Sequence, residues 1–294
     1  MRIIRFKTEN GARLGIIKGN SVIDVMSDSA DAPSDLASLL KRGPDALREF
    51  SEQADRASGN RVRPLSEIQA AIPIERPSKF VCLGLNFADH VEESTHDAPK
   101  YPMLFMRAAT SLIAHGDPMI APSVSNDVDY EAELAVIIGR TMRHVSPEQA
   151  LDGVAGYTCF NDGSVRDYQF HSTQWTMGKN FDKTGGFGPI FVTADELPRG
   201  AVGLKIETRV NGEIRQSNNT ANMIFNVADS ISYMSKGMTL EPGDVIAMGT
   251  CSGVALAFKP PKWLRDGDVV EVEIENIGIL RNKVVNERPA DRET

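Results

Sequence analysis

The chain has 294 residues, of which 41% are hydrophobic and 24% are charged, and its formal net charge is −8. These proportions predict an ordinary soluble globular protein with a substantial core, in one large domain or in one large and one small domain. The negative charge argues against a nucleic-acid partner, and no apolar run is long enough to span a bilayer.

The cysteines and the N-terminus predict a cytoplasmic protein. The three cysteines, Cys82, Cys159 and Cys251, are widely spaced and odd in number. This pattern indicates free thiols in a reducing compartment and does not fit zinc-finger spacing. Residues 1–7 carry charge and lack the extended apolar stretch of a secretory signal.

The first quarter of the chain combines short strands with helices. Turn signals at Asn10-Gly11 and Lys18-Gly19-Asn20 divide the stretch up to about residue 26 into a small β-meander. Residues 34–57 have a helical pattern that breaks near Gly43-Pro44. We therefore expect a small α+β unit at the N-terminus.

A proline-containing segment over residues 61–77 indicates an extended linker and a domain boundary. We predict a small N-terminal α+β domain over residues 1–72 and a larger domain over residues 73–294. The later patterns are mostly β, so the expected fold class is mixed α/β, mainly β. The elements expected there are strands at 80–83, 127–139 and 270–274, a polar helical turn at 87–94, a helix start at 146–148, a hairpin around 211–212 and a helix over 224–237.

The stretch over residues 127–139 is the most informative one. It mixes period-2 alternation with an apolar run, a pattern typical of a β-strand that enters a core. Side chains alternate along a strand, so Asp129, Glu131 and Glu133 are expected on one face. Their charges repel one another and burial disfavours them, and a hard divalent cation would relieve both effects. The alternative is an acidic face exposed to solvent.

His90 and Glu93 form a second candidate pair. They are three residues apart on a predicted helical turn, so they share a face and can hydrogen-bond. A carboxylate that orients an imidazole produces a general base that works near neutral pH. The alternative is a pair that only decorates the surface.

Later segments supply groups that complete such a site. Asp162 could join the two strand glutamates in an oxygen site with open positions, which suits Mg²⁺ or Mn²⁺. Arg166 can form a two-pronged contact to a substrate carboxylate, or it could pair with Asp167. Lys179 lies in a Gly-Lys pair without P-loop spacing. It is expected to face the carboxylates or a developing oxyanion, or to be solvated.

The segment Gly249-Thr-Cys-Ser-Gly253 fits the G-x-C-x-G pattern of a nucleophile elbow. That elbow needs a strand, a sharp turn and then a helix. The predicted strand over residues 245–248 leads instead into a loop rich in lysine and proline. We therefore expect Thr250 to donate a hydrogen bond to substrate and do not expect Cys251 to be a nucleophile.

Together these segments resemble the fumarylacetoacetate hydrolase (FAH) superfamily, from about residue 80 to the C-terminus. The matching motifs are Gly-x-Asn-aromatic-x-x-His-x-x-Glu at 84–93, Asp-Tyr-Glu-x-Glu at 129–133, Asn-Asp-x-x-x-Arg-Asp at 161–167, Gly-Lys-x-Phe-Asp at 178–182, Val-Asn-Gly-Glu at 210–213, Pro-Gly-Asp at 242–244 and Gly-Thr at 249–250. The resemblance implies a β-sandwich or β-roll catalytic domain with a small N-terminal domain, assembled as a homodimer.

The resemblance also implies roles for the candidate residues. One Mg²⁺ or Mn²⁺ per subunit would be bound by Glu131, Glu133 and Asp162. The catalytic groups would be Lys179 and the His90–Glu93 dyad, the dyad lying in a lid over the substrate. The substrate contacts would be Arg166, Gln169 and Thr250.

The sequence departs from the family pattern at three places. Phe87 stands where tyrosine is commoner, Arg107 replaces a frequent lysine, and Cys251 replaces the usual proline after Gly-Thr. None of these is expected to touch a ligand of the cation, and all are candidates to lie near the substrate.

The resulting functional hypothesis is a hydrolase that acts on carbon–carbon bonds. It would cleave an acylpyruvate or another 2,4-diketo acid into pyruvate, or a similar 2-keto acid, and a carboxylic acid. His90, held by Glu93, would activate the water, while the cation and Lys179 would stabilise the enolate. The alternative on the same site is an oxaloacetate-type decarboxylase or a 2-hydroxydienoate isomerase or hydratase. A metal-binding protein without turnover would need neither the dyad nor the lysine.

Overall fold

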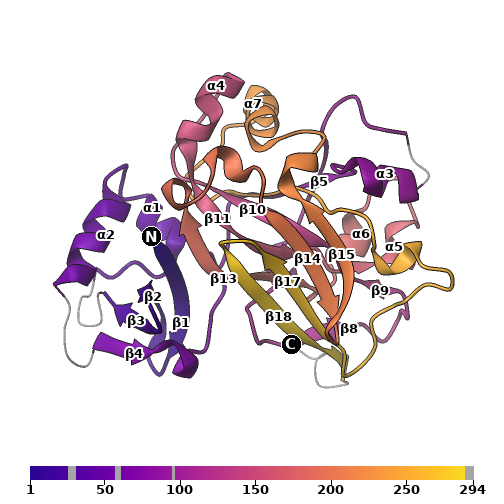
Figure 1. The fold of residues 1–294 in the computed structure, drawn as a ribbon, viewed down its shortest axis with the longest axis horizontal. Helices are drawn as coiled ribbons and strands as arrows, with labels where there is room; N and C mark the ends of the chain where they lie inside the picture. The colour runs from indigo at the N-terminus through magenta and orange to yellow at the C-terminus, as the bar shows by residue number, and fades with distance from the viewer. Residues whose placement is uncertain (26–30, 57–60, 95–96, 289–294) are drawn as a thin grey trace.

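The computed structural model describes residues 1–25, 31–56, 61–94 and 97–288. It has the predicted mixed α/β, mainly β architecture, with two β-sheets that pack face to face and short helices around them (Figure 1). The N-terminal strands form one end of the larger sheet and lie, with the N-terminal helices, at the left of Figure 1.

Within the described residues, the larger sheet has 11 strands and runs through both halves of the chain. Its strands are β1 (Arg2–Thr8), β2 (Gly11–Lys18), β3 (Ser21–Asp24), β4 (Val62–Pro64), β5 (Phe80–Gly84), β6 (Met103–Met106), β7 (Leu112–Ile113), β10 (Ala132–Ile138), β11 (Val154–Asn161), β13 (Gly185–Thr193) and β16 (Val245–Ala247). Their order is β4-β3-β2-β1-β13-β11-β10-β16-β5-β6, with β7 paired to β13.

The smaller sheet has five strands in the described part of the chain. They are β8 (Met119–Ala121), β14 (Lys205–Val210), β15 (Glu213–Asn219), β17 (Val269–Ile274) and β18 (Gly278–Asn286), in the order β15-β14-β17-β18-β8. A separate pair is formed by β9 (Val128–Asp129) and β12 (Ser164–Val165). The larger and the smaller sheet bury a shared apolar core between them. In this core, Leu134 of β10 belongs to the same cluster as Ile206 of β14 and Val272 of β17.

Helices flank the sheets and connect their strands. They are α1 (Leu36–Leu40), α2 (Ala46–Asp55), α3 (Ala88–Ser94), α4 (Pro147–Ala150), α5 (Arg166–Gln169), α6 (Thr176–Lys179) and α7 (Val227–Gly237). The predicted helix at 224–237 is confirmed as α7, which starts where the Asn226 side chain accepts a hydrogen bond from the backbone N–H of Asp229. Among the described helices, none is long and apolar enough to cross a membrane.

The segment over residues 61–77 is more ordered than the predicted linker. β4 pairs with β3, and Ala71 N donates to Arg5 O at 2.7 Å, so the segment runs along the N-terminal strands. Pro64 is tolerated because β4 lies at the edge of the sheet. β1 in turn pairs with β13, so the N-terminal strands extend the main sheet. The division at residue 72 stays a prediction, and residue 57, where the predicted helical stretch ended, lies outside the described residues.

The predicted single strand over residues 127–139 is wrong in one respect. It is broken into β9 and β10, with Tyr130 and Glu131 between them. β9 pairs with β12, whereas β10 lies between β11 and β16. The Asp129 carboxylate stabilises the break by accepting a hydrogen bond from Tyr130 N at 2.7 Å. Asp129 therefore belongs to a different strand pair from Glu133, although Arg166 contacts both Asp129 and Glu131.

Candidate metal centre and active site

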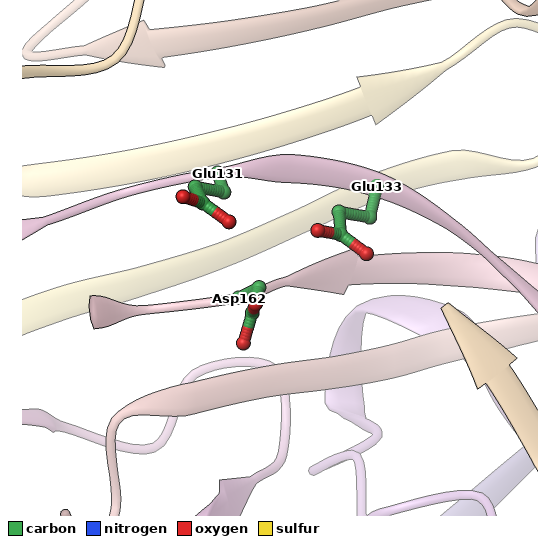
Figure 2. A group of neighbouring side chains, drawn as sticks. All are labelled: Glu131, Glu133 and Asp162. Atoms are coloured by element: carbon green, nitrogen blue, oxygen red, sulfur yellow. The ribbon is translucent and has the colours of Figure 1, made fainter. Parts of the chain in front are cut away.

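Three carboxylates converge at the point where β10 begins and β11 ends. Asp162 N donates to Glu131 O at 2.9 Å, which extends the pairing of the two strands by one step and places these residues opposite each other. Glu133 is two residues further along β10 and therefore points to the same side as Glu131. Figure 2 shows the three side chains as neighbours, and one oxygen from each carboxylate lies within 4.8 Å of the others.

Two buried cations contact Glu131 of this cluster. The ammonium of Lys179 donates to Glu131 Oε2 at 2.7 Å and to Asp162 Oδ2 at 2.8 Å. The guanidinium of Arg166 lies 2.6 Å from Glu131 Oε1 and 2.8 Å from Asp129 Oδ2. Because all these side chains are buried, the ion pairs are screened little by water.

Glu133 is the carboxylate that these cations leave uncompensated. A third cation, Arg107, binds Asp162 and the carbonyl of Gly163. Counting Asp129, four buried carboxylates thus share three cations among the described residues. Glu133 accepts a backbone hydrogen bond from Gly249 N at 3.0 Å and is the carboxylate whose ionisation gives the cluster a surplus negative charge.

The pKa values of the cluster reflect this imbalance. Burial, followed by the charges of Asp162 and Glu131, raises the pKa of Glu133 well above its ordinary value. Burial also favours a higher pKa for Glu131, but Lys179 and Arg166 outweigh it and lower the pKa to about 2. For Lys179, burial lowers the pKa, but Asp162 and Glu131 raise it by more, so the side chain stays an ammonium.

These observations test whether a divalent cation fits the site. Hard cations such as Mg²⁺ and Mn²⁺ prefer carboxylate oxygens, and the three groups offer one oxygen each within 4.8 Å. The surplus charge on Glu133 is the feature that an added cation would neutralise. Glu131, Glu133 and Asp162 therefore fit a divalent cation.

The predicted dyad is formed on helix α3. His90 Nδ1 lies 2.7 Å from Glu93 Oε1, and the pair is mostly buried. The carboxylate favours the tautomer with a proton on Nδ1, which leaves Nε2 as the ring nitrogen available to a substrate. The other oxygen of Glu93 accepts a hydrogen bond from Gly253 N at 2.9 Å, so the dyad is attached to the loop after β16.

One cavity of about 240 Å³ brings these groups together. Its polar wall contains the predicted site residues His90, Glu93, Glu131, Glu133, Arg166, Gln169, Lys179 and Thr250. Asp162, the third carboxylate of the cluster, is fully buried and accepts a hydrogen bond from Lys179, which does line the cavity. Apolar side chains also line the cavity, among them Phe105 and Trp175, whose rings pack edge to face.

Arg166 does not pair with Asp167 as one alternative had it. Asp167 accepts a hydrogen bond from Ser125 Oγ at 2.7 Å, while Arg166 donates to Gln169 Oε1 at 2.8 Å and is held by Asp129. The break before β10 explains this outcome, because it turns the Asp129 carboxylate toward the guanidinium.

One expectation about the departures from the family pattern is wrong, and the expectation that all three residues lie near the substrate stays a prediction. Arg107 does touch a presumed ligand, since it binds Asp162. Phe87 and Cys251 are fully buried and, like Arg107, are not among the residues that line the described cavity. Burial also raises the pKa of the Cys251 thiol, which opposes the formation of a thiolate nucleophile.

Sequence reasoning missed one residue that organises the site. The buried amide of Gln216 donates to Thr250 Oγ1 at 2.8 Å and to Cys251 O at 2.7 Å, and accepts from Ala132 N at 2.9 Å. Gln216 thus connects the strand that carries the glutamates with the loop that carries Thr250. A single glutamine in a hairpin strand gave no signal of this role.

Comparison with known proteins identifies the family. The fumarylacetoacetate (FAA) hydrolase C-terminal family matches residues 79–285, which is most of the chain. The protein therefore belongs to the FAH family of enzymes.

Among characterised relatives, oxaloacetate tautomerase FAHD2A of Homo sapiens is 39% identical over 97% of this chain and 92% of its own. Oxaloacetate tautomerase YisK of Bacillus subtilis is 42% identical over 81% of this chain and 80% of its own. Among solved structures, maleylpyruvate hydrolase from Sphingobium has a TM-score of 0.81 and 30% identity, covering 98% of this chain and 100% of that one.

Proposed function

We propose that this protein is a divalent-cation-dependent enzyme that interconverts the keto and enol forms of oxaloacetate or a closely related 2-keto acid. The observation that carries the proposal is the buried carboxylate cluster with its surplus charge on Glu133, which shares one cavity with Lys179 and the His90–Glu93 dyad. The relatives named oxaloacetate tautomerase support this reaction type over the carbon–carbon hydrolysis expected first.

The reaction needs a group that moves a proton at C3 and groups that accept negative charge on the C2 oxygen. A cation held by Glu131, Glu133 and Asp162 would supply Lewis-acid polarisation of the keto oxygen. The ammonium of Lys179 donates a hydrogen bond to the same oxygen as it gains charge. Arg166, Gln169 and Thr250 bind the carboxylate end of the substrate.

His90 is the proton carrier in this proposal. Its Nε2 takes the proton from C3, the electron pair of the broken C–H bond forms the C2–C3 double bond, and the C2 oxygen takes up the charge. Glu93, bonded to Nδ1, stabilises the imidazolium that forms. Solvent water protonates the C2 oxygen to give the enol while the imidazolium of His90 returns its proton to solvent, and the reverse sequence returns the ketone.

The test follows the decay of enol oxaloacetate by its ultraviolet absorbance, with carbon dioxide release measured in parallel. We expect decay faster than in buffer, loss of this acceleration in EDTA, and recovery with Mg²⁺ or Mn²⁺. Carbon dioxide release at the same rate would assign decarboxylation instead. No acceleration with either metal would reject the proposal.

A second candidate is hydrolysis of an acylpyruvate, favoured by the His90–Glu93 dyad, which is also suited to activating water. One of the similar solved structures is named maleylpyruvate hydrolase, which supports this second candidate. Water oxygen would bond to C4 while His90 takes its proton, the C3–C4 bond would break, and its electron pair would form a pyruvate enolate next to Lys179. Protonation at C3 gives pyruvate and a carboxylic acid. Pyruvate release from a panel of 2,4-diketo acids tests it.

We also propose that the protein is a homodimer, as the resemblance implies, and that it is cytoplasmic, as its cysteines and N-terminus indicate. Size-exclusion chromatography with light scattering tests the assembly, and a mass near 32.1 kDa, that of one chain, would argue against it.

A further inference from the structure

We propose that Asp89 is a positioning residue that holds helix α3, and with it His90, over the cavity. The inference rests on the proposed function, because it assigns Asp89 a role through the proton carrier. Asp89 directly precedes His90 in the chain, and its carboxylate is engaged by groups outside the cluster of cation ligands.

The Asp89 carboxylate joins α3 to two other parts of the fold. Its Oδ2 accepts hydrogen bonds from Ser252 Oγ at 2.6 Å, from Ser252 N at 3.3 Å and from Asn218 Nδ2 at 2.6 Å. Its Oδ1 accepts from the backbone N–H of His90 at 2.9 Å. Hydrogen bonds to an ionised carboxylate are stronger than those between neutral groups, so this is a substantial attachment.

Glu93 provides a second attachment on the same face of the helix. Asp89 and Glu93 are four residues apart and so lie one above the other on α3. They bind the consecutive backbone N–H groups of Ser252 and Gly253. Gly253 has a φ of +97°, and a Cβ there would lie 2.1 Å from Arg215 O. Glycine is therefore required at this position for the loop to present both backbone N–H groups to α3.

His90 lies between the two attachments. α3 has only seven residues, and a helix this short is not stable by itself in water. Its position therefore depends on the contacts that Asp89 and Glu93 make. The loop that receives them is itself fixed by Gln216. Loss of the Asp89 attachment should let the imidazole shift while the cation ligands stay in place.

The direct test compares Asp89→Asn with Glu92→Gln, which removes a charge from an exposed position of the same helix. In Asp89→Asn, an NH₂ group replaces the oxygen that accepts hydrogen bonds from Ser252 and Asn218. Donors then face donors, and these hydrogen bonds are lost. We expect Asp89→Asn to lower kcat about tenfold to a hundredfold, the cost of a misplaced catalytic group, with KM nearly unchanged. Glu92→Gln should behave as wild type. Wild-type kcat in Asp89→Asn would overturn the proposal.

A double-mutant cycle separates positioning from a general structural effect. In a His90→Ala background, adding Asp89→Asn should cause little further loss of kcat, because the group that Asp89 positions is already gone. If the kcat losses of the two single variants multiply in the double variant, the proposal is overturned.

Hydrogen exchange of the α3 amides gives a readout that does not require turnover. We expect faster exchange over Ala88–Ser94 in Asp89→Asn and wild-type exchange in Glu92→Gln. Unchanged exchange in Asp89→Asn would overturn the attachment. If wild type shows no turnover, the proposed function fails while this experiment still decides whether the attachment exists. If Asp89→Asn does not fold, Ser252→Ala combined with Asn218→Ala removes the same contacts from the partner side, with the same expectations.

Discussion

The surplus charge on Glu133 leads to a prediction about stability. Replacing it by glutamine in Glu133→Gln removes one of four buried carboxylates that share three cations. The metal-free variant should therefore be more stable than wild type at neutral pH, although the substitution destroys a proposed ligand. A substitution that only removed the contacts of a buried residue would instead destabilise the fold.

The magnitude follows from the geometry of the cluster. Two unit charges at the 4.8 Å limit repel by about 3 kcal/mol when the effective dielectric constant is about 20. Lys179 offsets part of the repulsion felt by Glu133, and the glutamine keeps an oxygen for the hydrogen bond from Gly249 N. We expect a net gain of about 1–3 kcal/mol. At about 2–4 °C per kcal/mol, the metal-free Tm should rise by roughly 2–12 °C.

The pH dependence of this gain has a definite sign. The pKa of Glu133 is raised in the folded state, so its ionisation opposes folding. The penalty is absent below the unfolded pKa, about 4.3 for glutamate, and grows as the pH rises above it. The Tm difference between Glu133→Gln and wild type should therefore be present at neutral pH and disappear in acid.

Calorimetry in EDTA and in excess Mn²⁺ measures both effects. Wild type should gain about 2.7 kcal/mol when the cation is at 100 times its Kd, whereas Glu133→Gln should gain much less. Glu92→Gln serves as the control for loss of a surface charge. A lower metal-free Tm in Glu133→Gln, or a metal-induced shift as large as that of wild type, would refute the reasoning.

Three further predictions concern single side chains. Glu131→Gln should weaken cation binding and abolish turnover in a folded protein, as measured by isothermal calorimetry and the enol assay; wild-type kcat would contradict the ligand assignment. His90→Ala should keep nearly the same cation affinity but lower kcat by roughly 10²–10⁴, the range for a lost general base; unchanged kcat would remove His90 from the mechanism. Cys251→Ser should keep turnover that EDTA abolishes, because the buried thiol is no nucleophile; EDTA-resistant turnover that needs Cys251 would reverse this conclusion.

Much of the fold follows from local sequence patterns. The turn residues around Asn211-Gly212 and the apolar spacing of α7 specify their elements within a few residues, and both are confirmed. The pairing of β1 with β13 was not predictable, since it joins residues almost 190 positions apart and depends on the packing of the whole sheet. For the same reason residues 61–77 resembled a linker although they pair with the N-terminal strands.

The carboxylate cluster was predictable partly from local geometry and partly from the family resemblance. Glu131 and Glu133 share a side through the period of a strand, and the motif containing Asp162 gave its third member. The partners of the cluster were harder to predict. The contact of Asp129 with Arg166 depends on the break at Tyr130. The contact of Arg107 with Asp162 joins residues far apart in the chain and depends on long-range packing. Neither has a signature in the spacing of residues.

The most direct test of the central claim is to locate a cation in crystals grown with Mn²⁺, using its anomalous scattering. The account predicts one strong peak per chain, within about 2.0–2.2 Å of an oxygen from each of Glu131, Glu133 and Asp162, as expected for a small hard cation. A cluster that stays free of Mn²⁺ at saturating concentration, or a peak bound elsewhere in the cavity, would contradict it.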